Sequence, residues 1–365
     1  MNTVSCINCR TAYPDTGTPY KCPRCGGIYD FTGPFHYDPG EVDDRWPGIW
    51  RYLHAFGLPQ DAPIVTLGEG HTPLVWGQAF GMRLAFKCEH QNPTGSFKDR
   101  GNATLVSFVR SRGVETAIED SSGNAGASFS AYAARAGIKA RVFIPESASG
   151  PKRQQIEAYG AEAVLIPGPR SNASDAVRQE ADAGVAYASH AYLPFNLPGY
   201  ATAAYEIVEQ LGGAPGSVIM PVGQGGFLLG MIRGFEALQA ASVIESFPVF
   251  VGVQARACAP LWALSVYGPA GIARISEGQT VAEGIRVTFP LRGDALMQSM
   301  NTHQGMIVAV SEEEILQGQA ALARGGLYVE PTSAVVWGAL GQVAGQIPEP
   351  VVLMLTGTGL KWLKT

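Results

Sequence analysis

Lys98 lies in a sequence context that suits covalent chemistry with a carbonyl group. It is part of Pro93-Thr94-Gly95-Ser96-Phe97-Lys98-Asp99-Arg100-Gly101, between a turn-forming stretch and a helix-like stretch that begins near Arg100. A lysine at a helix start faces the positive end of the helix dipole, which disfavours its ammonium form. Such a lysine can form a Schiff base with a carbonyl cofactor. A turn followed by an exposed, charged helix start explains the same residues without any chemistry.

A glycine-rich loop further along the chain could bind an anion. Gly223, Gln224, Gly225 and Gly226 follow the apolar strand expected at 217–222 and precede the helix expected at 227–241. Backbone N–H groups at a helix start bind anions, and glycine lets a phosphate approach the main chain closely. An ordinary tight turn between a strand and a helix explains a lone glycine loop equally well.

Two other loops between expected elements carry hydroxyl or amide side chains. Ser121, Ser122, Gly123, Asn124 and Ala125 open the helix expected at 125–136, and such a helix start suits a carboxylate. Capping of that helix also explains a serine or an asparagine there. Thr356 lies in Leu355-Thr356-Gly357-Thr358-Gly359, directly after an apolar strand.

Four cysteines at the N-terminus have the spacing of a metal site. Cys6 and Cys9, and then Cys22 and Cys25, form two Cys-x2-Cys turns, which together supply a tetrahedral set of four thiolates. Two disulfides in a secreted module are the alternative, but the N-terminus lacks the pattern of a signal peptide. We therefore expect structural zinc. Catalytic zinc is not expected, because four thiolates leave no open coordination position.

Composition excludes several classes of function. The 365 residues, 46% of them hydrophobic, suffice for two lobes and a small appendage. A net charge of −5 without a basic block argues against nucleic acid or an anionic membrane as a partner. No apolar run reaches the ~18 residues that indicate a membrane span. We expect a soluble, cytoplasmic protein.

Strand and helix patterns alternate along most of the chain, which predicts an α/β protein with mainly parallel sheets. Strands are predicted at 84–87, 116–119, 140–144, 163–166, 217–222, 249–253 and 351–355. Helices are predicted at 102–112, 125–136, 152–159, 172–183, 200–211, 227–241, 312–324 and 332–343.

In their order, these motifs resemble the pyridoxal-phosphate (PLP) enzymes of fold type II, the tryptophan synthase beta superfamily, and threonine synthases in particular. The segment 66–74 and the N-terminal cysteines fit this family too. The resemblance implies that Lys98 forms the Schiff base with PLP and removes the Cα proton. It implies further cofactor contacts from Asn124, from Gly223, Gln224, Gly225 and Gly226 to the phosphate, and from Thr356 to the pyridine nitrogen. The loop of Ser121, Ser122, Gly123, Asn124 and Ala125 would hold the α-carboxylate of the substrate.

The same resemblance implies a two-lobed architecture. A zinc-ribbon-like module would occupy residues 1–30 and a linker or arm residues 31–62, which Trp46, Trp50 and Tyr52 could anchor. The large PLP-binding lobe would comprise 63–99 and 194–365, and the small mobile lobe 100–193. By analogy with the family, we expect a homodimer that acts on a small amino acid.

The implied reaction converts O-phosphohomoserine and water to threonine and phosphate. The stretch 193–202, however, lacks the arginine and lysine that threonine synthases commonly carry there, so Arg100, Arg153, Arg286 or Arg292 would have to supply the charge. An ammonia-lyase of serine/threonine dehydratase or diaminopropionate type, or a β-replacing synthase like cysteate synthase, is the alternative. A non-catalytic interaction protein on the same fold is a third. His190 and His303 could reach an active site, although lone histidines are usually structural.

Overall fold

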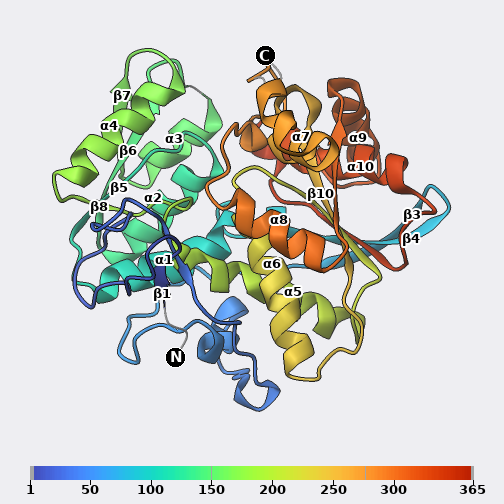
Figure 1. The fold of residues 1–365 in the computed structure, drawn as a ribbon, viewed down its shortest axis with the longest axis horizontal. Helices are drawn as coiled ribbons and strands as arrows, with labels where there is room; N and C mark the ends of the chain where they lie inside the picture. The colour runs from blue at the N-terminus through green and yellow to red at the C-terminus, as the bar shows by residue number, and fades with distance from the viewer. Residues whose placement is uncertain (1–3, 149, 276, 363–365) are drawn as a thin grey trace. The chain divides into compact units, whose positions relative to one another are not determined.

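The computed structural model describes residues 4–148, 150–275 and 277–362, and the chain forms two compact units (Figure 1). The first unit comprises residues 1–70 and 92–202, and the second comprises 71–91 and 203–365. Helix α5 (Leu197–Leu211) begins in the first unit and continues into the second. Each unit is built around its own sheet.

The first unit contains a four-stranded parallel sheet in the order β7-β6-β5-β8. Its strands are β5 (Thr116–Glu119), β6 (Lys139–Pro145), β7 (Glu162–Ile166) and β8 (Ala186–Tyr187). The helices are α1 (Lys98–Ser111), α2 (Asn124–Ala136), α3 (Pro151–Ala158) and α4 (Arg170–Asp182). Successive strands proceed in one direction from β5 to β7, whereas β8 pairs on the other side of β5. The carboxyl ends of β5 and β8 therefore flank a topological switch point, where ligands bind in open α/β sheets.

The second unit contains a six-stranded sheet in the order β11-β10-β9-β12-β4-β3. Only β3 (Leu74–Ala79) is antiparallel to its neighbour, β4 (Met82–Lys87). The other strands are β9 (Ser217–Pro221), β10 (Val249–Ala255), β11 (Met306–Val310) and β12 (Val351–Met354). Strands β9 to β11 proceed in one direction and β12 pairs on the other side of β9, so a second switch point lies between β9 and β12.

Helices and short 3-10 segments complete both units. The further helices of the second unit are α6 (Gly226–Ala240), α7 (Pro260–Tyr267), α8 (Gly293–Thr302), α9 (Glu312–Arg324) and α10 (Pro331–Val343). The 3-10 segments are η1 (Pro39–Glu41), η2 (Gly48–Ala55), η3 (Glu89–Gln91), η4 (Pro194–Asn196), η5 (Arg256–Cys258), η6 (Gly268–Arg274), η7 (Glu283–Ile285) and η8 (Gly359–Lys361). No helix of the described residues is long and apolar enough to cross a membrane.

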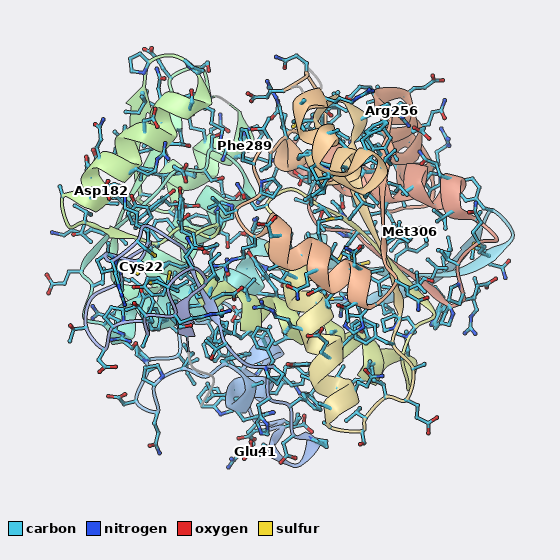
Figure 2. The ribbon with its side chains drawn as sticks, viewed as in Figure 1. Cys22, Glu41, Asp182, Arg256, Phe289 and Met306 are labelled. Atoms are coloured by element: carbon cyan, nitrogen blue, oxygen red, sulfur yellow. The ribbon has the colours of Figure 1, made fainter. Side chains whose placement is uncertain are left out.

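The N-terminal segment belongs to the first unit. Strands β1 (Val4–Cys6) and β2 (Tyr29–Phe31) pair in antiparallel fashion around the cysteine turns. Figure 2 labels Cys22 in this segment. Tyr13 packs edge-on against Phe108 and Phe195, with ring centroids 5.8 and 5.0 Å apart. The module thus shares its aromatic core with α1 and η4.

The segment predicted as a linker or arm, 31–62, is partly ordered by burial. Trp50 and Tyr52 on η2 are fully buried, and Trp50 Nε1 donates to Glu69 Oε1 at 2.7 Å. These two anchors agree with the prediction. Trp46 does not serve as an anchor, because its side chain is 40% exposed.

The two units divide the chain differently from the predicted lobes. Residues 63–70, 92–99 and 194–202 are predicted in the large lobe, yet they belong to the first unit. Hydrogen bonds and close packing explain the grouping. Val65 N donates to Ser107 Oγ at 3.0 Å, and a Cβ at Gly199 would lie 2.1 Å from the backbone oxygen of Arg100. These segments therefore pack directly on α1.

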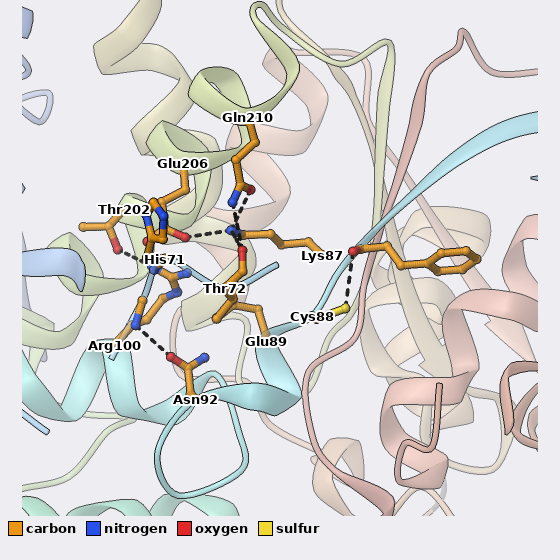
Figure 3. Close-up of polar contacts among 12 residues, drawn as sticks. His71, Thr72, Lys87, Cys88, Glu89, Asn92, Arg100, Thr202, Glu206 and Gln210 are labelled. Atoms are coloured by element: carbon orange, nitrogen blue, oxygen red, sulfur yellow. Dashed lines mark hydrogen bonds and ion pairs between the residues drawn. The ribbon is translucent and has the colours of Figure 1, made fainter. Parts of the chain in front are cut away.

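A buried ion pair fixes β4 to α5 within the second unit (Figure 3). Lys87 Nζ donates to Glu206 Oε2 at 2.7 Å, to the backbone oxygen of Thr72 at 2.8 Å and to Gln210 Oε1 at 2.9 Å. Lys87 is fully buried. All three ammonium hydrogens are satisfied, so Lys87 has a structural role.

Candidate active site

The glycine loop of the second unit lies at the carboxyl end of β9, at the switch point. Gly225 is the N-cap residue of α6 and has φ +84, a left-handed conformation that favours glycine. No side chain caps α6. The start of this 15-residue helix, with Gly225 as its N-cap residue, has the form of an anion site at a helix N-terminus.

Packing against η7 and the start of α8 fixes the glycine loop 223–226. A Cβ at Gly223 would lie 3.1 Å from the backbone oxygen of Gly284, so the loop lies directly against η7. Gln224 Oε1 accepts a hydrogen bond from Leu291 N at 3.2 Å, next to the start of α8. The structure therefore provides a cradle of backbone donors that fits a phosphate group.

Thr356 follows β12 and lies on the other side of the same switch point. Its side chain is buried, and its backbone N–H donates to Ser333 Oγ at 2.6 Å. Ser333 Oγ also lies 3.5 Å from Thr356 Oγ1 and 3.4 Å from Gly357 N. Capping of α10 does not explain Ser333, because no side chain caps that helix. Ser333 instead positions the hydroxyl expected to face a cofactor ring.

Lys98 is the first residue of α1, four residues before the predicted helix start. The helix begins early because Asp99 fixes the preceding turn. Asp99 Oδ2 accepts from Thr94 N at 2.6 Å, and Oδ1 accepts from Thr94 Oγ1 at 2.5 Å and Ser128 Oγ at 2.6 Å. Lys98 Nζ lies 4.8 Å from the centre of the Phe97 ring, and its side chain is partly exposed. The expected helix-start position is thus confirmed.

The loop after β5 runs directly into α2. Gly123 is the N-cap residue, and no side chain caps the helix. Ser121 Oγ accepts from Gly123 N at 3.2 Å, so a serine of this loop does bond the backbone at the helix start. A Cβ at Gly126 would lie 1.8 Å from the backbone oxygen of Ser121, so this loop can fold tightly onto α2 only with glycine there. Backbone donors at a helix start without a side-chain cap suit a carboxylate.

A buried acid and a histidine flank this loop. Glu119 ends β5 and is 1% exposed, and its Oε1 lies 2.7 Å from Nδ1 of His190, just after β8. Burial raises the pKa of Glu119 well above 4.5, and it lowers the pKa of His190 well below 6.5. The positive charge of Lys98 is close enough to lower both pKa values. The other flagged histidine, His303, has a structural role: it stacks on Phe247 at 3.8 Å and bonds Glu236 at 2.8 Å.

The stretch 193–202 belongs to the first unit and contains no positively charged side chain. It forms η4 and the start of α5, where Asn196 and Tyr200 are buried polar residues. Asn196 Nδ2 donates to the backbone oxygen of His190 at 2.6 Å. The polar side chains of this stretch are therefore neutral amide, phenol and hydroxyl groups, the last from Thr202.

Of the four arginines considered as substitutes, two belong to the first unit. Arg100 is fully buried and donates to Thr202 Oγ1 at 2.9 Å. Arg153 bonds Glu157 at 2.9 Å. Arg286 and Arg292 belong to the second unit, where Arg292 is buried at the N-cap of α8, directly after the residue that contacts the glycine loop.

The N-terminal cysteines converge. The sulfur atoms of Cys6, Cys9, Cys22 and Cys25 all lie within 4.8 Å of one another, and all four are free thiols. A tetrahedral zinc site with Zn–S bonds of about 2.3 Å has sulfur atoms about 3.8 Å apart. The four thiols therefore fit a zinc ion. Cys88 and Cys258 are buried as expected, and burial raises the pKa of Cys88 to about 11.

The residues predicted to bind the cofactor and the substrate are divided between the two units. The first unit contains Lys98, whose charge is close enough to lower the pKa of Glu119 at the end of β5, and the loop that follows β5, which comprises Ser121, Ser122, Gly123, Asn124 and Ala125. The second unit contains Gly223, Gln224, Gly225, Gly226 and Thr356. Glu119 was missed, because it ends a strand and belongs to no recognisable motif.

Comparison with known proteins places the chain in a family. The family model for pyridoxal-phosphate dependent enzymes matches residues 65–357. A threonine synthase of Methanocaldococcus jannaschii is 34% identical, covering 98% of this chain and 92% of that protein. One from Synechocystis is 35% identical, covering 87% and 84%. The solved threonine deaminase of T.th. is 28% identical with a TM-score of 0.65, covering 80% of this chain and 94% of that one.

Proposed function

This chain belongs to the family of pyridoxal-phosphate dependent enzymes, and we propose that it is a lyase of threonine-synthase type. In this proposal it converts O-phosphohomoserine and water to threonine and phosphate. The observation that carries the proposal is the similarity to threonine synthases along nearly the whole chain. The M. jannaschii alignment spans 98% of the chain and so reaches into the N-terminal segment that precedes the family domain.

The residues at the two switch points suit the cofactor. Lys98 would hold the cofactor aldehyde covalently, and Asn124 would donate to its 3′ oxygen. The N–H groups of Gly223, Gln224, Gly225 and Gly226 would bind the phosphate at the start of α6. Bound PLP supplies an electron sink for the carbanion at Cα.

Thr356 would face the pyridine nitrogen with a hydroxyl. A hydroxyl, unlike a carboxylate, does not hold that nitrogen strongly protonated, which favours elimination and replacement. Ser333 fixes the orientation of this threonine through the 2.6 Å bond to its backbone N–H. The buried position of Thr356 supports a role facing a ligand rather than solvent.

The first unit would bind and activate the amino acid. Ser121, Ser122, Gly123, Asn124 and Ala125 would hold the α-carboxylate at the start of α2, where its charge also complements the helix dipole. Lys98 Nζ would then take the proton from Cα. Asp99 supports this step because its three hydrogen bonds hold the first turn of α1.

The N-terminal module would bind structural zinc through Cys6, Cys9, Cys22 and Cys25. All six cysteines are free thiols, which suits a reducing compartment, and we propose that the protein acts in the cytoplasm. By analogy with the family, we also propose a homodimer. Elemental analysis for zinc and light scattering for mass test these two statements.

One observation favours a second candidate function. The stretch 193–202 contains amide, phenol and hydroxyl side chains but no cation of its own, whereas a buried phosphate dianion needs charged or multiple donors. An ammonia-lyase of serine/threonine dehydratase or diaminopropionate type, or a β-replacing synthase like cysteate synthase, needs no such cation. The similarity to a threonine deaminase structure supports this alternative.

A panel of substrates separates the two candidates. The PLP-loaded protein would be given O-phosphohomoserine, threonine, serine, O-phosphoserine with sulfite, and 2,3-diaminopropionate. Phosphate, threonine and 2-oxo acid would be measured in parallel. Threonine and phosphate in equal amounts from O-phosphohomoserine would establish the proposed function. No turnover of O-phosphohomoserine, together with 2-oxo acid or a replacement product from another substrate, would refute the proposed function in favour of the second candidate.

A further inference from the structure

Glu119 and His190 form a hydrogen-bonded pair at the switch point of the first unit. They are 71 residues apart in the sequence, and β5 and β8 bring them together because the carboxyl ends of neighbouring parallel strands share one edge of the sheet. Glu119 Oε1 lies 2.7 Å from Nδ1 of His190. The pair directly precedes the loop proposed to hold the substrate carboxylate.

The burial of the Glu119–His190 pair disfavours its ionised form, in which both side chains carry a charge. The side chains of Glu119 and His190 are 1% and 13% exposed. Glu119 Oε2 is buried and has no hydrogen-bond partner among the described residues. An ionised carboxylate with one oxygen unsatisfied is costly, whereas a carboxylic acid needs only one acceptor for its proton. The geometry therefore favours a neutral pair in which Glu119 donates to Nδ1.

The surrounding charges are compatible with this state. Burial dominates the raised pKa of Glu119 and the lowered pKa of His190. The charge of Asp120 raises both pKa values, whereas a hydrogen bond from its backbone lowers the pKa of Glu119. The charges of Lys98 and Arg170 lower both pKa values. The titratable groups that share an electrostatic interaction with the pair are Lys98, Asp120, Arg170, Tyr187 and Tyr200.

One nitrogen of the imidazole remains available for a ligand. Nδ1 bonds Glu119, and Nε2 is the other ring nitrogen of this partly exposed side chain. The backbone around His190 is fixed, because Asn196 Nδ2 donates to its carbonyl oxygen at 2.6 Å. The hydrogen bond from Glu119 therefore fixes the imidazole ring, and the hydrogen bond from Asn196 fixes the backbone that carries it. The charge of Lys98 is close enough to affect the pKa of His190.

We propose that His190, held by Glu119, donates and accepts the proton at the side chain of the bound amino acid, while Lys98 serves the proton at Cα. This inference rests on the proposed function, because it concerns the oxygen that leaves Cγ with the phosphate and the water oxygen that adds at Cβ. It assigns two separate proton-transfer groups to two separate positions of one substrate.

The proton balance closes over one cycle. In the first half, the bond between Cγ and the departing phosphate oxygen breaks, the Nε2–H bond of His190 breaks, and an O–H bond forms on the departing phosphate. The proton that leaves Cβ is matched by the proton that Cγ gains. The Glu119 O–H bond breaks as the Nδ1–H bond forms, so the negative charge rests on Glu119, facing the positive charge of Lys98. In the second half, Nε2 takes a proton from the water that adds its oxygen to the substrate. The Nδ1 proton then returns to Glu119.

The test compares two variants with a matched control in the PLP-loaded protein. His190→Gln and Glu119→Gln remove the proton transfer and keep side chains of comparable size. His303→Gln is the control, because His303 forms a similar histidine–glutamate pair with Glu236 at 2.8 Å in the second unit. The measurements are the visible absorption of the cofactor, exchange of the Cα hydrogen in D2O, and turnover.

General acid–base catalysis contributes about 10²–10⁴-fold. We expect His190→Gln to lower kcat by about 10²-fold or more, with Cα exchange and the cofactor spectrum as in wild type. Glu119→Gln should lower kcat by less and change its pH profile. His303→Gln should match wild type. Turnover by His190→Gln equal to that of His303→Gln would overturn the inference, and so would parallel losses of Cα exchange and turnover.

A second measurement does not depend on activity. The ring signals of His190 in the NMR spectrum of the PLP-loaded protein, identified by their loss in His190→Gln, should stay in the neutral form below the ordinary histidine pKa of about 6.5. A normal titration of His190 would refute the neutral pair whatever the substrate. A wild-type protein that turns over none of the amino acids would instead refute the proposed function, and the inference would fall with it.

Discussion

Asp99, next to Lys98, should be essential for the stability of the first unit. It is fully buried, and its carboxylate accepts from Thr94 N, Thr94 Oγ1 and Ser128 Oγ at 2.5 to 2.6 Å. These bonds join the turn before α1 to α1 and α2. Removing the carboxylate therefore leaves three donors inside the protein without their acceptor.

The magnitude follows from those three bonds. A hydrogen bond to a charged group contributes about 1.5–3 kcal/mol, and a buried donor left unsatisfied costs about 1–3 kcal/mol. Relief from desolvation of the carboxylate offsets part of this, and removal of one partner of a buried charged network costs about 3–5 kcal/mol. We expect Asp99→Ala to destabilise the protein by about 3–5 kcal/mol. Asp99→Asn should cost about 1–3 kcal/mol, because its amide oxygen can still accept from the two hydroxyls, whereas its amide nitrogen cannot accept from Thr94 N.

Urea unfolding of the cofactor-free protein measures the free energy of unfolding of each variant. The visible absorption of added PLP shows whether Lys98 can still form the Schiff base. Asp175→Ala is the control, because Asp175 is 59% exposed and forms a surface ion pair with Arg178. Surface pairs contribute little, so the control should resemble wild type. A free energy of unfolding of Asp99→Ala within about 1 kcal/mol of that of the control would refute the reasoning. A difference of this size is close to the precision with which urea unfolding is extrapolated to water.

Three further changes test other parts of the account. Gly126→Ala places a Cβ 1.8 Å from the Ser121 carbonyl oxygen, so we expect about 1–3 kcal/mol of destabilisation and a raised KM; an unchanged KM would contradict the close packing. Cys22→Ser should lose zinc by elemental analysis and unfold at a lower temperature, whereas full zinc retention would exclude the four-thiolate site. Burial raises the pKa of Glu119, so the folded protein keeps a proton that the unfolded chain loses above about pH 4.5. As the pH rises toward the raised pKa, this group should lower the free energy of unfolding of the wild type by up to about 1.4 kcal/mol per pH unit, and Glu119→Gln should lack this contribution. Equal slopes of the unfolding free energy against pH in the two proteins, measured with urea, would contradict a neutral Glu119.

Local patterns predicted most of the elements. The strand at 116–119 and the helix at 312–324 agree with β5 and α9 at both ends. Strand β3 was missed because it lies at a sheet edge with a largely exposed face. Helix α7 was missed because its residues are largely apolar and show no helical period.

The site could be predicted only as far as motifs extend. Lys98 and the glycine loop are recognisable because helix starts and tight turns leave local signals. The Glu119–His190 pair leaves none, since its two residues meet only through the order of β5 and β8. Ser333 likewise bonds the backbone of Thr356, 23 residues away, through the packing of α10. The strand order and the packing of α10, which no local pattern specifies, create these two contacts.

The central claim is that the chemistry of this chain depends on PLP bound covalently at Lys98. Reduction of the PLP-loaded protein with borohydride, followed by mass spectrometry of its peptides, tests it most directly. The account predicts one reduced cofactor on the peptide that contains Lys98, and none on Lys98→Ala. A reduced cofactor on another lysine, or equal labelling of Lys98→Ala, would contradict it.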